Sequence, residues 1–171
     1  FSSLEDRGFI FSKVLGIGLS GFLTWVLVVC KAAKFTSGAA LAVTAVSMAV
    51  CWILYIKKAE KKAPNLDLVL GEELIFLAFF LLWTYFAGFR PEATGTEKFM
   101  DYGFMAAMMR SDTLPARDLW YSEGTINYYY GGQYFAVFLT KLTGTGVEKT
   151  YNIMRTFVAS FAFVLPFTLV R

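Results

Sequence analysis

The amino-acid sequence predicts an all-α membrane protein: a polytopic helix bundle with about five transmembrane helices and an external loop that carries an amphipathic surface helix. Of the 171 residues, 57% are hydrophobic types and only 17% are charged, whereas soluble domains have about 25% charged residues. So much Phe, Leu and Val also excludes a disordered chain. With two Cys and no His, the chain is neither a disulfide scaffold nor a His-dependent catalyst.

The net charge of the chain is +3. In a membrane protein such an excess of Lys and Arg mainly sets orientation, so we expect membrane lipids around the chain and no nucleic-acid partner. The sequence begins on Phe1 instead of Met and ends on Arg171, directly after an apolar run. These ends predict an internal fragment of a larger membrane protein; the alternative is a short, processed protein.

Five apolar segments account for the expected transmembrane helices. The first, residues 9–29, is long enough to cross a hydrocarbon core of about 30 Å at 1.5 Å per residue. The others cover residues 36–56, 74–89 (extended by 68–71), 126–142 and 153–170. Small side chains let another helix approach closely, and the middle of the first segment contains Gly16, Gly18 and Gly21.

The loops predict the direction of the chain. The densest basic run contains Lys57, Lys58, Lys61 and Lys62. The positive-inside rule places this run in the cytoplasm, unless it is a solvated charge run without topological meaning. The loop 90–125 then faces outside. Cys30 and Cys51 fall near opposite ends of the first two segments, about 22 Å apart in depth, so we expect no disulfide between them.

The external loop is where chemistry is expected. Residues 94–97 fit a capping box, and residues 97–110 have the pattern of an amphipathic helix on the membrane surface. Glu97 and Asp101 are four residues apart, so both carboxylates lie on one face of that helix. Such a helix would turn both carboxylates towards water or a cavity. The alternative is a surface helix with two solvated acids and a Met-rich packing face.

The end of the loop is rich in aromatic and amide side chains. Asp118 is either a second acidic contributor or the cap of a turn, and Trp120 suits the headgroup level. On a helix, three consecutive tyrosines would point about 100° apart and would not all line one pocket face. They form either an aromatic belt or a mouth suited to a sugar ring. The candidate substrate-binding residues are Asp118, Trp120, Asn127, Tyr128, Tyr129, Tyr130 and Gln133; no metal ligand is assigned.

Several stretches of the sequence, including this one, resemble those of a known family of membrane proteins. The stretch LPARDLWYSEGTINYYYGGQY at residues 114–134 is specific, and further matches are DRGFIFSKVLG, EELIFLAFFLLW and RPEATGTEKFMDYGFM. The chain resembles the YYY family of archaeal and Chloroflexi-type membrane proteins, named for the tyrosine triplet. It departs from the usual pattern with Ala116 in place of a second proline and Gly131 in place of a phenylalanine.

The layout of that family resembles integral-membrane glycosyltransferases of the GT-C type. The resemblance implies sugar transfer from a polyprenyl-phosphate donor at the external face of a prokaryotic cytoplasmic membrane. It implies Asp101 as general base with Glu97 assisting, either with Mg²⁺ or Mn²⁺ or without a metal. It also implies two parts: residues 1–65, two added N-terminal helices with the basic loop, and residues 66–171, the start of a GT-C-like module.

Two other functions stay open at this point. One is a non-enzymatic membrane subunit that packs against partner proteins or lipids, a role that the glycines and the Met-rich helix would serve equally well. The other is a transporter, which is disfavoured because the apolar spans contain few charges and these lie near the span ends. The charges concerned are Lys13, Lys141 and Arg155.

Overall fold

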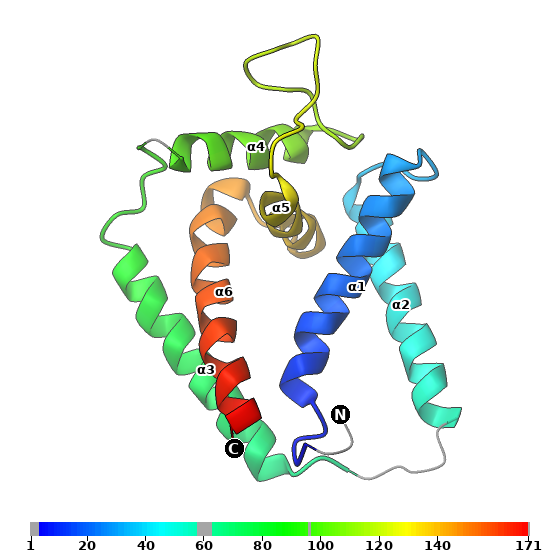
Figure 1. Ribbon diagram of the computed structural model, residues 1–171, viewed down its shortest axis with the longest axis vertical. Helices are drawn as coiled ribbons and strands as arrows, with labels where there is room; N and C mark the ends of the chain where they lie inside the picture. Colours follow the sequence, from blue (N-terminus) through cyan, green and yellow to red (C-terminus); the bar gives the residue numbers. More distant parts are fainter. Residues whose placement is uncertain (1–3, 58–62, 96, 171) are drawn as a thin grey trace. The chain divides into compact units, whose positions relative to one another are not determined.

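The computed structural model describes residues 4–57, 63–95 and 97–170. Within these ranges the chain forms six α-helices (Figure 1): α1 (Phe9–Val29), α2 (Ser37–Lys57), α3 (Leu66–Ala87), α4 (Lys98–Arg110), α5 (Gly131–Thr143) and α6 (Val147–Val170). The described residues contain no β-strand and one isolated β-bridge, between Arg117 and Thr125. The predicted all-α class is therefore confirmed.

Three of the described helices, α1, α2 and α6, are long and apolar enough to cross a membrane. The helix α3 has 22 residues and is not among them. The helix α5 has 13 residues, which rise about 20 Å and fall short of a hydrocarbon core of about 30 Å. The described residues thus contain three candidate spans, the predicted five are not confirmed, and the helix within the predicted segment 126–142 is too short for a full crossing.

Local sequence sets the ends of the helices. The helix α1 has the bounds that its apolar run predicts. The helix α3 begins before residue 74, as expected, because the side chain of Asn65 accepts a hydrogen bond of 3.1 Å from the backbone N–H of Asp67. The helix α5 ends at Gly144, whose φ of +69° lies in the left-handed region that glycine adopts without strain.

Two predictions concern residues at the ends of α1 and α2. Most of the basic run lies outside the described residues, which stop at Lys57 and resume at Ala63. The direction of the chain through the membrane therefore stays a prediction.

Cys30 and Cys51 are free thiols with exposed side chains, so the expectation that no disulfide joins them is confirmed.

Contacts divide the chain into two units, of which the first contains residues 1–17, 50–91 and 152–171. The core of its described part is formed by the buried side chains of Ile10, Phe161 and Val164. The ring of Phe161 lies 4.7 Å from that of Phe76 on α3 and 4.9 Å from that of Phe157 on α6. Aromatic packing of this kind holds α3 against α6.

Polar side chains connect the same two helices above and below this aromatic cluster. The hydroxyl of Thr168 donates a hydrogen bond of 2.9 Å to the buried carboxylate of Glu72, and Thr84 donates one of 3.1 Å to Thr156. Hydrogen bonds between membrane helices fix their register. The ammonium of Lys13 on α1 forms an ion pair with Glu73 on α3, so this charge is satisfied inside the unit.

The second unit contains residues 18–49 and 92–151. Within it, α4 lies across the start of α5 (Figure 1). The largest fully buried side chains of the unit include Phe35, Met108, Tyr134 and Phe138. The hydroxyl of Tyr134 donates a hydrogen bond of 2.7 Å to the backbone carbonyl of Gly21, which ties α5 to the second half of α1.

A buried lysine joins α4 and α5 in this unit. The Nζ atom of Lys141 donates a hydrogen bond of 3.1 Å to the carbonyl of Met109 and lies 4.7 Å from the ring centroid of Phe35. Its contact satisfies one of the carbonyls left over in the last turn of α4, and a cation there is favourable to the helix dipole. Lys141 lies in the last turn of α5, near the end of its segment as the sequence predicts, and only 8% of the residue is exposed.

Enlarging Gly21 is expected to destabilise the second unit by about 1–3 kcal/mol, because overpacking displaces rings. A Cβ atom at Gly21 would lie 2.5 Å from Cε1 of Phe135, whereas one at Gly18 meets nothing within 4 Å. We therefore expect Gly21→Val to lower the Tm of the protein in lipid, and Gly18→Val to change it much less. Equal losses for both variants would show that helix propensity, not the contact with α5, sets the effect.

Candidate functional site

The candidate carboxylates lie at the start of α4. Asp101 is in the first turn of the helix, and Arg110 is in the last turn, an order that complements the helix dipole. The side chains of Phe104, Met105 and Met108 are buried, so α4 is an amphipathic helix as predicted. The capping box was wrong: Glu97 itself occupies the N-cap position and makes no side-chain cap hydrogen bond.

A hydrogen bond joins Asp101 to α5. The Nε2 atom of Gln133 donates to Oδ1 of Asp101 over 2.6 Å. The amide must present its NH₂ group here, because an ionised carboxylate only accepts hydrogen bonds. The other amide atom, Oε1 of Gln133, is buried and has no hydrogen-bond partner among the described residues. Gln133 therefore orients the carboxylate of Asp101, and its contact with a substrate stays a prediction.

The tyrosine triplet precedes α5 and is not helical. The helix begins only at Gly131, so the expected directions 100° apart do not apply. Instead all three tyrosines line one pocket of about 280 Å³, together with Trp25, Asn127 and Gly131. The prediction that the three rings would not share one pocket was wrong, because the bend at residues 128–129 replaces the helical rotation.

Trp25 is the pocket residue that sequence reasoning missed. It belongs to the second half of α1, and its Nε1 donates a hydrogen bond of 3.2 Å to the hydroxyl of Tyr130. The rings of Tyr128 and Tyr129 meet edge to face at 4.0 Å. The available signal was an indole, which carries a polar N–H that needs a partner, inside an otherwise apolar run.

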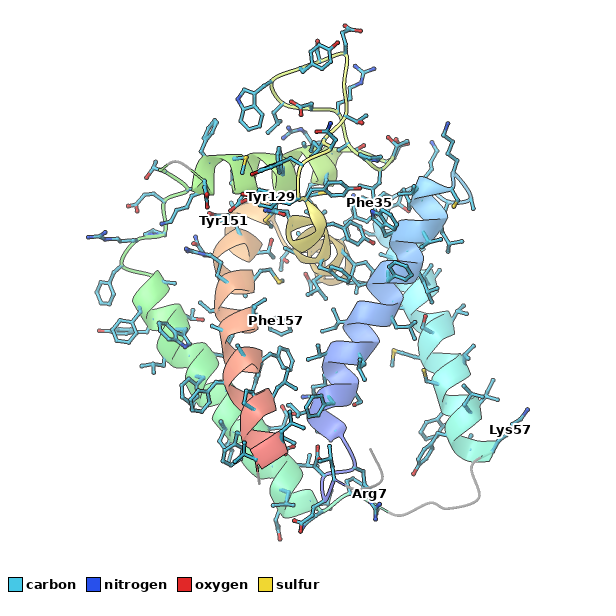
Figure 2. All side chains as sticks on the ribbon, viewed as in Figure 1. Arg7, Phe35, Lys57, Tyr129, Tyr151 and Phe157 are labelled. Carbon is cyan, nitrogen blue, oxygen red and sulfur yellow. The ribbon has the colours of Figure 1, made fainter. Side chains whose placement is uncertain are left out.

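The candidate carboxylates act electrostatically on this pocket. The pKa of Tyr129 is raised, first by desolvation of its hydroxyl and then by the negative charges of Glu97, Tyr128 and Asp101. Figure 2 shows Tyr129 beside α4, just before the start of α5. The structure therefore brings two groups of predicted residues together: the acids of α4 and the aromatic stretch that precedes α5.

Comparison with known proteins places the chain in a family. The model of an uncharacterized membrane protein family, DUF2298, matches residues 19–171, which is most of the chain. The protein belongs to the DUF2298 family. The tyrosine triplet predicted an uncharacterised membrane family of this type, and that prediction is confirmed. No curated protein and no solved structure matches the chain.

In this DUF2298 member, Asp118 and Trp120 lie apart from the pocket lining. The Oδ1 atom of Asp118 accepts hydrogen bonds from the backbone N–H groups of Trp120 and Tyr121, at 2.8 and 3.1 Å. This is the turn-capping role that the sequence offered as an alternative. The ring of Trp120 packs edge to face on Phe104 of α4, with centroids 5.9 Å apart. Contact of either residue with a substrate stays a prediction.

The donor set for a metal ion is small. Among the described residues of this family member, no group of three or more His, Cys, Asp or Glu side chains is placed to hold a metal. Mg²⁺ and Mn²⁺ prefer several oxygen ligands in octahedral geometry. This chain would offer Glu97 and Asp101, and one oxygen of Asp101 already accepts from Gln133. The residues present do not form a cation site by themselves.

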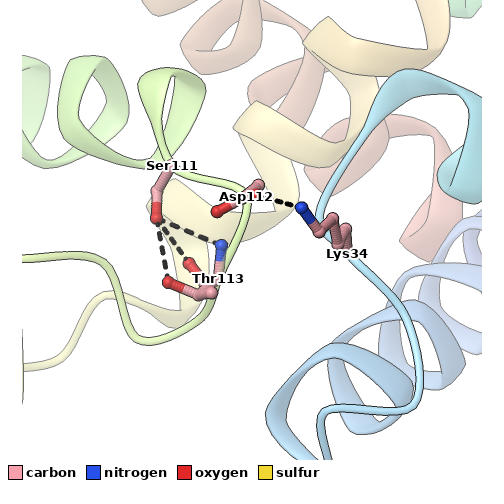
Figure 3. A network of polar contacts seen from close by, with 4 residues as sticks. All are labelled: Lys34, Ser111, Asp112 and Thr113. Carbon is pink, nitrogen blue, oxygen red and sulfur yellow. Dashed lines mark hydrogen bonds and ion pairs between the residues drawn. The ribbon is translucent and has the colours of Figure 1, made fainter.

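An ion pair joins the loop after α1 to the loop after α4 (Figure 3). The Nζ atom of Lys34 lies 3.1 Å from Oδ2 of Asp112, and the N–H of Phe35 donates to the backbone carbonyl of Asp112 over 2.7 Å. Ser111 and Thr113 brace the turn, with Thr113 N–H donating to Ser111 Oγ over 3.2 Å. The hydrogen bond and charge of Lys34 lower the pKa of Asp112 below its ordinary value of 3.8.

This pair predicts a small pH dependence of stability. Because the folded state favours the ionised carboxylate, the pair stabilises the fold above the ordinary pKa and stops doing so as the pH falls through the lowered pKa. We expect Asp112→Asn to lower Tm by about 1–2 °C at pH 6, and the difference to disappear as the pH falls well below the ordinary pKa of 3.8.

Salt and a matched carboxylate test the origin of that difference. Both side chains of the pair are well exposed, so 0.5 M NaCl should shrink the effect of Asp112→Asn. Glu123→Gln, at an exposed position of the same loop, should leave Tm unchanged at every pH. A difference that persists at pH 2 would show that the side chain acts through packing and not through its charge.

Proposed function

We propose that this chain forms part of a membrane glycosyltransferase that transfers a sugar from a polyprenyl-phosphate donor at the external face of the membrane. One observation carries the proposal: a pocket of aromatic rings and an amide lies at the start of α5, where Gln133 donates a hydrogen bond to the carboxylate of Asp101 on α4. Pockets with aromatic walls and a few placed polar groups are typical of small-ligand sites. The carboxylates supply the chemistry that such a site needs.

In the proposed reaction, an acceptor hydroxyl attacks the anomeric carbon of the donor sugar from the side opposite the phosphate. Its proton passes to Oδ2 of Asp101, which acts as general base, while Gln133 holds Oδ1. The new bond joins the acceptor oxygen to the anomeric carbon. The bond between that carbon and the phosphate oxygen breaks, and polyprenyl phosphate leaves with the electron pair. The configuration at the anomeric carbon is inverted.

The rest of the chain supports this assignment through its surfaces. The apolar helices α1, α2 and α6 are suited to lipid contact, as an enzyme with a polyprenyl substrate requires. On and beside α4, the rings of Phe99 and Trp120 are exposed, and such rings favour the level of the lipid headgroups. A surface helix at this level would present Asp101 where a lipid-borne phosphate and a water-borne acceptor meet.

The test of the proposal is turnover by the full-length protein in lipid bilayers. Radiolabelled polyprenyl-phosphate hexoses and pentoses are supplied with a mixture of membrane glycolipid and peptide acceptors, and loss of label from the donor lipid is followed by extraction. We expect protein-dependent transfer to at least one acceptor, with inverted configuration in the product. Release of free sugar without transfer, or no loss of label with any donor, would contradict the proposal.

A non-enzymatic subunit is the second candidate, and one observation favours it. Positions Gly16 and Gly18 of α1 leave open space in which a Cβ atom would meet nothing within 4 Å. A small-residue face of this kind allows a partner helix to approach closely. If this function is correct, Gly16→Val and Gly18→Val should release partners from the purified native complex, while Asp101→Asn should leave the complex intact.

A further inference from the structure

The charge of the pocket bears on the class of ligand that it accepts. We infer that the pocket formed by Trp25, Asn127, residues 128–130 and Gly131 binds an uncharged polyhydroxyl ring and rejects anionic sugars. This inference rests on the proposed function and deepens it, because it assigns the sugar ring to the pocket and the phosphate to a place outside it.

The lining itself contains no charged side chain. It consists of one indole, one amide, three phenols and a glycine. An anionic ligand held there would lack a cationic partner in the wall, whereas anion sites in proteins normally supply one. Phenol hydroxyls and the amide of Asn127 instead match the donors and acceptors of ring hydroxyl groups.

Acidic groups act on the hydroxyl of Tyr129 of the pocket, in the order Glu97, Tyr128 and Asp101. The carboxylates of Glu97 and Asp101 have the wrong sign for an anionic ligand. Carboxylates at the edge of a pocket repel a ligand carboxylate or phosphate and leave a neutral ligand unaffected. Because Gln133 binds Oδ1 of Asp101, its carboxylate is held in place as an acceptor for hydroxyl groups.

The walls and the size of the pocket favour a single ring. The indole of Trp25 lines the pocket and is positioned by its hydrogen bond to Tyr130, and an aromatic ring in a pocket wall is suited to the apolar C–H face of a sugar. The volume is about 280 Å³, just below the range of about 300–1,000 Å³ for ligand sites. An oligosaccharide would extend beyond such a pocket, whereas one ring fills it.

The experiment compares two ligands that differ only in charge. The full-length protein in nanodiscs is titrated with methyl glucoside and with the corresponding methyl glucuronide, and binding is followed by saturation-transfer NMR. We expect the neutral glycoside to bind about fivefold or more tightly, the size of effect that two screened charges produce. Raising NaCl from 50 to 500 mM should reduce the ratio.

Variants separate the walls of the pocket from its charges. Trp25→Ala and Tyr128→Ala should weaken the neutral glycoside, whereas Tyr121→Ala, at an exposed ring outside the lining, should not. The combined change Glu97→Gln with Asp101→Asn should bring the glucuronide close to the neutral glycoside. If Trp25→Ala fails to fold, Tyr128→Ala provides the same test. The Tyr128 side chain is 56% exposed, so its removal should leave the fold intact.

The outcomes distinguish this inference from the proposed function. Equal binding of the two ligands by the wild type would overturn the inference and leave the transferase proposal standing, as would detectable turnover without binding at the pocket. Selective binding without turnover would support the inference and overturn the transferase. Displacement of the glycoside by a polyprenyl-phosphate sugar, and not by polyprenyl phosphate alone, would identify the bound ring as that of the donor.

Discussion

Asp101→Asn is expected to lower turnover of a polyprenyl-phosphate sugar by about 10²–10⁴-fold, the contribution of a positioned general base. Asparagine has nearly the same shape, and its side-chain oxygen still accepts the hydrogen bond that Gln133 donates over 2.6 Å. The contact between α4 and α5 therefore survives, and the loss is one of proton acceptance alone. Turnover and Tm are measured on the same full-length preparation in lipid.

The controls for Asp101→Asn use other carboxylates of the same segment. Glu123→Gln makes the same exchange of carboxylate for amide at an exposed position and should retain full turnover. Glu97→Gln should lose less than Asp101→Asn, because Glu97 lies at the N-cap of α4 without a partner that orients its side chain. Retained turnover in Asp101→Asn would remove this residue from the mechanism, and a matching fall in Tm would reduce its role to structure.

Phe161→Ala is expected to destabilise the first unit by about 3–5 kcal/mol, the range for removing a buried aromatic ring. The ring is 8% exposed and lies between Phe76 of α3 and Phe157 of α6. Its removal leaves a cavity that rigid helices do not collapse into, and the aromatic contacts are lost as well. Thermal unfolding in lipid gives the size of the effect.

The matched control for this change lies on the same helix. Phe167 is 40% exposed, so Phe167→Ala removes the same atoms from a site with fewer neighbours and should cost much less. Phe161→Leu should recover part of the loss, because it restores most of the volume. If Phe161→Ala and Phe167→Ala lowered Tm equally, the aromatic cluster would not be the feature that holds α3 against α6.

The fold was predictable where the sequence pattern is local. The bounds of α1 and the start of α3 follow from apolar length and from the Asn65 cap. The amphipathic character of α4 was predictable from the spacing of its apolar residues, whereas its N-cap residue was not. The prediction of a transmembrane helix over residues 126–142 failed because the residues before Gly131 continue the apolar pattern of the helix. In the structure the backbone bends before Gly131, and only 13 residues are helical. Composition measures hydrophobicity, and it does not locate a bend.

The candidate site was predictable in its residue types and not in its assembly. The acids of α4 and the tyrosine triplet were found as separate features, but nothing in their spacing indicated that Gln133 would orient Asp101. The pairing of Trp25 with Tyr130, and that of Lys34 with Asp112, are contacts between distant parts of the chain. Such contacts depend on how helices pack, which short-range periodicity does not encode.

The bond between Trp25 and Tyr130 has a consequence for biosynthesis. The two residues are 105 positions apart in the chain, and a ribosome adds about 5–20 residues per second. Tyr130 is therefore synthesised roughly 5–20 s after Trp25. A nascent chain that has completed α1 to α4 still lacks residues 127–131 and therefore has no pocket. Any ligand of this pocket can bind only after the tyrosine triplet has been made.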